Sequence, residues 1–183
     1  THDISSGIEF IYESQRNNTL ALPTGVTQTA ANLYSPSTDD IFVNPVHTGA
    51  STDGSTLTSG VYVLDTIHLN EQWQLNASGR FEHYKTETDT VTIQGTATPQ
   101  IIPVGTKLGS SVEASDNLAS YKLGALYKPA SNGSVYLSYA TSQLPPGGAN
   151  FTLSETAGNI NNPNLDPQKG TNLELGTKWD LLN

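Results

Sequence analysis

Hydrophobic and polar residues alternate with a period of two along six segments of the chain. Such alternation is typical of β-strands whose two faces meet different surroundings. It is cleanest in the last segment, where Leu173, Leu175 and Trp179 face away from Glu174 and Lys178. The pattern predicts six strands, which run over the following residues: Asp3–Ser14, Thr58–Leu69, Trp73–Lys85, Leu118–Lys128, Ser134–Gln143 and Thr171–Leu181.

The connections between these segments alternate strictly between long and short. The long ones cover about residues 15–57, 88–117 and 144–170, and the short turns cover 70–72 and 129–133. In an antiparallel meander, alternate connections emerge at the same end of the sheet. All long loops therefore lie on one rim, as in outer-membrane barrels with short periplasmic turns and long extracellular loops. We expect an all-β, antiparallel, up-and-down transmembrane barrel architecture with three long extracellular loops.

The aromatic residues gather at the two ends of the predicted strands, on their apolar faces. Two such belts separated by aliphatic residues match a band that faces lipid. The same aromatics would also fill the core of a soluble β-sandwich, whose solvated outer face would then carry the polar residues. One group lies beside the short turns and the other at the far ends: Trp73, Tyr127 and Trp179, then Phe10, Tyr12, Phe81, Tyr121 and Tyr139.

Composition narrows the classes of protein further. The chain has 183 residues, 8 Lys and Arg against 17 Asp and Glu, and a net charge of −9. Nucleic-acid binding needs clustered basic residues, which this chain lacks. Without cysteine it has no disulfide and no thiolate chemistry. The chain also lacks methionine, even at position 1, which indicates a processed or excised piece of a longer protein.

Searches for catalytic and metal-binding motifs give nothing. No G-x-S-x-G sequence, P-loop or dinucleotide-binding fingerprint is present. No carboxylate pair has the spacing of an acid–base couple. The histidines lack metal-ligand spacing; they are His2, His47, His68 and His83. We therefore expect no enzyme activity, no cofactor and no metal site.

The segment from Asn162 to Trp179 reads NPNLDPQKGTNLELGTKW. It resembles the barrel signature of TonB-dependent outer-membrane receptors, in which an Asn-Pro-x-Leu-x-Pro-Glu-Lys turn leads into a strand reading Glu-x-Gly-x-Lys. The chain departs from this signature at Gln168, where Glu is usual. Two further stretches, Trp73–Tyr84 and Tyr121–Ser142, resemble an outward strand and a hairpin of the same barrels.

This resemblance implies a fold, a location and a set of partners. Family members carry a plug domain and a TonB box ahead of 22 strands, so residues 1–183 are expected to form a partial β-barrel domain of about six strands, without the plug domain and the remaining strands. The implied function is active import of ferric siderophores across the bacterial outer membrane, with the catecholate type as the nearest subgroup. The implied partners are a ferric siderophore, TonB through the absent plug domain, and outer-membrane lipid.

Ligand recognition is expected on the long loops and the upper lumen, because an iron chelate needs a concave aromatic and polar surface. For each candidate, loop packing or ordinary solvent exposure is the alternative interpretation. The candidates are Arg16, Tyr34, Phe42, Tyr84 and Phe151.

Two rival functions remain open from sequence alone. A soluble β-sandwich binding module, such as an adhesin or glycan-binding domain, would be monodisperse in detergent-free buffer. A slice of a passive porin would come from a parent without a plug.

Overall fold

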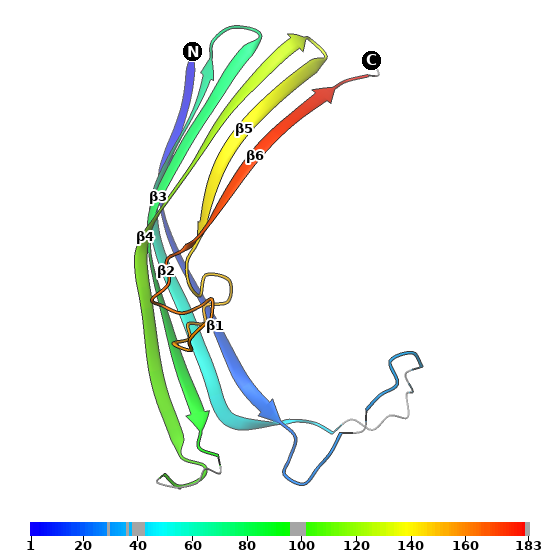
Figure 1. Ribbon diagram of the computed structural model, residues 1–183, viewed down its shortest axis with the longest axis vertical. Coiled ribbons are helices and arrows are strands. Elements are labelled where there is room, and N and C mark those ends of the chain that lie inside the picture. Colours follow the sequence, from blue (N-terminus) through cyan, green and yellow to red (C-terminus); the bar gives the residue numbers. More distant parts are fainter. Residues whose placement is uncertain (29, 36, 38–42, 96–101, 182–183) are drawn as a thin grey trace. The chain divides into compact units, whose positions relative to one another are not determined.

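The computed structural model describes residues 1–28, 30–35, 37, 43–95 and 102–181. Six strands form one antiparallel sheet in sequential order, as predicted (Figure 1). Within the described ranges there is no helix, and hence no helical segment able to cross a membrane. The strands are β1 (His2–Ala21), β2 (Val46–His68), β3 (Trp73–Ile93), β4 (Lys107–Ala130), β5 (Gly133–Leu144) and β6 (Gln168–Trp179).

The chain divides into two compact units. The first unit comprises Thr1–Ser14, Gly54–Thr88 and Val112–Asn183. It contains β5 and β6 entire, together with the parts of β1 to β4 in which the apolar alternation is found. The second unit comprises Gln15–Asp53 and Asp89–Ser111, which hold the remaining parts of β1 to β4.

Strands β1 to β4 are longer than the alternation predicted. In the second unit, the backbone of Gln94 pairs with that of Thr106 (2.9 Å), and the Thr48 hydroxyl donates a hydrogen bond to the Thr19 carbonyl (3.1 Å). The expected loops 15–57 and 88–117 are therefore wrong in extent. These strand extensions are rich in Ser and Thr, and the β-branched Thr is enriched in strands.

The turn between β4 and β5 is shorter than the predicted connection 129–133. Ala130 pairs with Gly133, which leaves Ser131 and Asn132 as the turn. Gly133 instead lies opposite Trp179 of β6, and a Cβ atom at Gly133 would come within 2.2 Å of that indole ring. The glycine therefore makes room for an aromatic residue on the neighbouring strand.

The two faces of the sheet in the first unit differ sharply. We call the face that bears Phe10, Phe81 and Leu175 the outer face, and the opposite one the inner face. Phe10 is 76% exposed and Leu175 is 74% exposed. Neighbouring aromatics pair at both ends of this face: Trp73 stacks on Tyr127 at 4.6 Å, and the Tyr121 and Tyr139 rings lie 6.0 Å apart.

Few apolar residues are buried. The only buried hydrophobic cluster in the described residues consists of four side chains, with Val112 packed against it: Tyr84, Ala114, Leu118 and Leu153. A soluble sandwich would bury the residues that here form the outer face. An exposed apolar surface of this extent is typical of a protein that meets lipid or a partner.

Candidate functional site

The inner face of the first unit carries a bridging ion-pair network. Arg80 on β3 forms ion pairs with Glu82 on its own strand and with Glu9 on β1. Strand β2 lies between, and its Gly60 lies beside the network, since a Cβ atom there would lie 3.3 Å from Cβ of Glu82 and 3.7 Å from Nη2 of Arg80. Arg80 thus joins β1 to β3 across the intervening strand.

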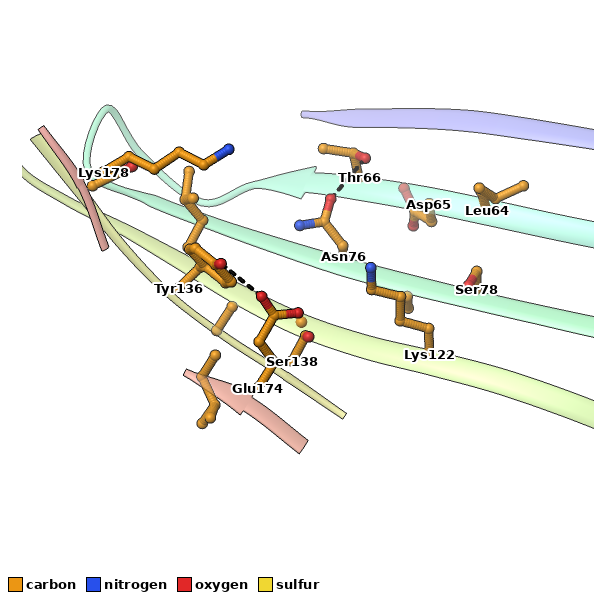
Figure 2. A pocket seen from close by; sticks show the side chains of 16 residues that line it. Leu64, Asp65, Thr66, Asn76, Ser78, Lys122, Tyr136, Ser138, Glu174 and Lys178 are labelled. Atoms are coloured by element: carbon orange, nitrogen blue, oxygen red, sulfur yellow. Dashed lines mark hydrogen bonds between the residues drawn. The ribbon is translucent and has the colours of Figure 1, made fainter. Parts of the chain in front are cut away.

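An open pocket of ≈ 530 Å³ lies on the same inner face, near the short turns, and is lined by residues of β2 to β6. Lys122 and Lys178 extend over it (Figure 2). Neither lysine forms an ion pair with any described residue. The pocket therefore presents two ammonium groups without an ion-pair partner, in a lining that also contains the carboxylates of Asp65 and Glu174.

Two pairs of other polar side chains in this pocket are joined by hydrogen bonds (Figure 2). The Tyr136 hydroxyl donates to Oε1 of Glu174 at 2.7 Å. The Thr66 hydroxyl donates to Oδ1 of Asn76 at 3.0 Å. These pairs fix the wall, so Lys122 and Lys178 are the cations free to meet an anion there.

The β5–β6 connection, residues 145–167, lies against the inner face of the first unit, and we call it the docked loop. At Gly54 of β2, a Cβ atom would come within 1.9 Å of the Phe151 carbonyl oxygen, so the loop backbone touches the strand directly. The Thr88 hydroxyl of β3 donates to that carbonyl at 3.0 Å and accepts the N–H of Leu153 at 2.9 Å. Phe151 itself has a positive φ of 53°.

Side chains of β3 and β4 complete this seat. Leu153 enters the buried cluster that contains Tyr84, which is only 3% exposed. Burial, with a smaller contribution from the Asp116 carboxylate, raises the pKa of the Tyr84 phenol above its usual value. Beside the cluster, the hydroxyls of Thr56 and Thr86 hydrogen-bond to each other at 2.8 Å. The docked loop is thus attached through both apolar and polar contacts.

The five candidate ligand residues fall in different places. Tyr84 and Phe151 belong to the docked-loop seat, Tyr84 buried and Phe151 partly buried. In the second unit, Arg16 pairs with Asp53 (3.3 Å), and Tyr34 is 95% exposed. Phe42 lies outside the described residues. Ligand contact by these residues stays a prediction.

Sequence reasoning missed Thr88 and Gly54, the residues on which the docked loop rests. The run Thr86-Glu87-Thr88 places two threonines on one strand face, which is the signal that was available. Lys178 does belong to the polar face that the alternation predicts for the last strand. No described group of three or more His, Asp or Glu side chains is arranged to hold a metal ion.

Comparison with known proteins places the chain among receptor barrels. A family model described as "TonB dependent receptor-like, beta-barrel" matches residues 2–183. The chain is 39% identical to the catecholate siderophore receptor Fiu of Escherichia coli (strain K12), over 100% of this chain and 25% of that protein. The probable TonB-dependent siderophore receptor PiuA of Acinetobacter baumannii is 28% identical over 86% of the chain and 20% of its own length.

Solved structures agree with these sequence matches. The crystal structure of the closed form of the ferric-catecholate import receptor Fiu from K12 E. coli superposes with a TM-score of 0.86 at 35% identity, covering 100% of this chain and 26% of that one. The A. baumannii receptor PiuA gives a TM-score of 0.70 at 22% identity, covering 99% of this chain and 26% of PiuA, a likeness of fold alone. The chain spans about a quarter of the length of these relatives.

Proposed function

Because the chain belongs to the TonB-dependent receptor β-barrel family, we propose that it forms part of the wall of a receptor that binds and imports ferric siderophores. The observation that carries this proposal is the two-faced sheet: an exposed apolar outer face and an inner face with ion pairs, a polar pocket and a docked loop. A lipid-facing band around a polar interior is the arrangement of an outer-membrane barrel.

Family membership also fixes the location and the class of activity. TonB-dependent receptor barrels are outer-membrane proteins of Gram-negative bacteria, and the family consists of receptors and transporters, not enzymes. For this chain we propose contact between the outer face and membrane lipid. We further propose that TonB supplies energy through a plug domain of the whole protein, and that residues 1–183 contribute only a partial barrel.

The proposed ligand is a ferric siderophore of the catecholate type, as the names of the relatives suggest. Iron(III) catecholates are polyanions, and Lys122 and Lys178 offer them unpaired positive charge on the inner face. Ligand recognition is assigned to the long loops, with Arg16, Tyr34, Phe42, Tyr84 and Phe151 as candidates. Tyr84 would act indirectly, since its ring packs in the cluster with Leu153.

Uptake of radioactive iron by whole cells tests this function. The full-length parent should import the iron(III) complex of a synthetic tris-catechol chelator, and cells lacking TonB should not. Versions with all three long connections shortened, 22–45, 94–106 and 145–167, should lose uptake while remaining in the outer membrane. Undiminished uptake by these versions would remove the loops from ligand recognition, and TonB-independent uptake would favour a passive porin.

A further inference from the structure

We propose that the docked loop is a fixed part of the ligand-binding surface on the inner face, and that Thr88 is the residue that positions it. The inference rests on the proposed function, because it concerns how the same receptor recognises its ferric siderophore. It assigns Thr88 a positioning role, since this side chain is 1% exposed and acts through the loop.

The Thr88 hydroxyl satisfies two backbone groups of the loop at once. It donates a hydrogen bond to the Phe151 carbonyl (3.0 Å) and accepts one from the Leu153 amide (2.9 Å). A threonine hydroxyl can do both, and valine, of nearly the same shape, can do neither. Removing the hydroxyl therefore leaves two loop groups unpaired at a buried contact, which strongly favours release of the loop.

The same stretch of loop packs directly against the backbone of β2 at Gly54, which has no side chain. The Phe151 carbonyl occupies the space that a Cβ atom at Gly54 would need. Leu153 adds an apolar anchor in its buried cluster, where it is 4% exposed. Three kinds of contact, from β2, β3 and the Leu153 cluster, converge on residues 151–153, so this short segment sets the position of the loop.

The rest of the loop is braced to that segment through Asn161. Its side-chain oxygen accepts the amide of Gly147 (3.4 Å), its carbonyl accepts the amide of Ser154 (3.1 Å), and its side-chain nitrogen donates to Asn150 (3.4 Å). These contacts tie residues on both sides of the 151–153 segment to Asn161. A shift at residues 151–153 should therefore be passed on to the exposed groups beside Asn161.

The exposed part of the loop has the chemistry that a catechol ring needs. Ile160 is 68% exposed and Leu165 is also exposed, while Asn150 and Asn164 present carboxamides. Apolar side chains can contact the ring faces, and amide groups can hydrogen-bond to the oxygen-bearing edges. The loop carries Glu155 and Asp166 but no Lys or Arg, so its contribution is shape and hydrogen bonding.

The test uses the purified full-length receptor and the iron(III) complex of a synthetic tris-catechol chelator. Thr88→Val should speed amide hydrogen exchange of residues 145–161 and weaken binding of the complex, each by about tenfold. Thr88→Ser keeps the hydroxyl and should restore both. Thr141→Val is the matched control, because the Thr141 hydroxyl makes the same two backbone contacts to Tyr121 (3.0 and 3.4 Å), away from the loop.

A second variant disturbs the contact between the docked loop and β2, and it serves if Thr88→Val fails to assemble. Gly54→Ala should push residues 151–153 off β2 and weaken binding in the same way. Gly109→Ala is its control, because nothing lies within 4 Å of the added Cβ atom.

Each remaining outcome overturns a distinct part of the inference. Unchanged exchange in both assembled variants would show that Thr88 and Gly54 do not hold the loop. Faster exchange with unchanged affinity would remove the loop from the binding surface while leaving the proposed function intact. Failure of the unmodified receptor to bind the complex would instead refute the proposed ligand class, and with it the loop's part in recognition.

Discussion

The ring of Tyr136 on β5 covers Gly176, its cross-strand partner on β6. A Cβ atom at position 176 would lie 2.3 Å from Cζ of Tyr136 and 2.4 Å from its hydroxyl oxygen. From this position the hydroxyl donates its hydrogen bond to Glu174. The glycine therefore fixes the orientation of a tyrosine that lines the inner pocket.

Gly176→Ala should displace the Tyr136 ring and break its hydrogen bond to Glu174. Because the clashing atoms are the partly exposed end of a side chain, the main cost is the lost hydrogen bond, which should lower the free energy of unfolding by about 0.5–1.5 kcal/mol. Gly79→Ala, where nothing lies within 4 Å of the new Cβ atom, should change it by less than about 0.5 kcal/mol. Denaturant unfolding of the full-length receptor in detergent measures both, and equal effects would contradict the covering role of Tyr136.

Removing the guanidinium of Arg80 should destabilise the sheet, because Glu9 and Glu82 lose their shared cation. We expect Arg80→Gln to lower the free energy of unfolding by about 1–2 kcal/mol, a value reduced by the partial exposure of all three side chains. Arg80→Lys should lie between, since an ammonium group cannot reproduce the planar fork. An Arg80→Gln variant as stable as the unmodified receptor would reject the bridging role.

The unpaired lysines of the pocket should affect transport and leave stability unchanged. Replacing both Lys122 and Lys178 by Gln removes positive charge from the proposed ligand-binding surface, so uptake of an anionic iron(III) tris-catecholate should fall by about tenfold. Lys169→Gln is the control. Lys169 is exposed, has no ion pair in the described residues, and lies on the same outer face of β6 as Leu173 and Leu175, away from the pocket. A comparable loss in the control would mean that charge at this pocket has no special effect.

Titration of Tyr84 offers a check on the docked-loop seat. Because burial raises its pKa above the usual 10.0, the phenol stays neutral to higher pH than an exposed tyrosine. Its contribution to folding is therefore complete below pH 10.0 and is lost as the pH rises through the higher folded-state pKa. The difference in tyrosinate absorbance between the receptor and its Tyr84→Phe variant should rise above pH 10. A rise at or below the ordinary value would contradict the buried placement.

The sequence predicted the strands where the two faces meet different surroundings. Apolar and polar positions alternate from Trp73 to Lys85, and β3 begins at Trp73 as expected. Past residue 85 the strand runs on to Ile93 with little apolar alternation. Periodicity could not mark such an extension, because the buried positions on its inner face are threonines, Thr86 and Thr88, and not apolar residues.

The docked loop was beyond the reach of sequence patterns for a different reason. Thr88 and Phe151 are 63 positions apart, and their contact joins a side chain to a backbone carbonyl. Such a contact leaves no periodicity and requires no particular side chain at position 151. By contrast, the family signature identified the start of the last strand although Gln168 replaces the usual Glu. Gln168 begins β6 and pairs with Leu144.

The buried cluster under the docked loop is small, whereas the exposed apolar face is large, so we expect the positions that tolerate substitution to differ from those of a soluble protein. In a soluble protein the large apolar residues are the constrained ones, and the surface varies. Under the proposed contact with lipid, the many apolar residues of the outer face meet a fluid environment, so Ile, Leu, Val and Phe should interchange there with little effect. Variation should be scarce at small and hydroxyl-bearing positions such as Gly54, Thr86 and Thr88, which a hydropathy profile would pass over.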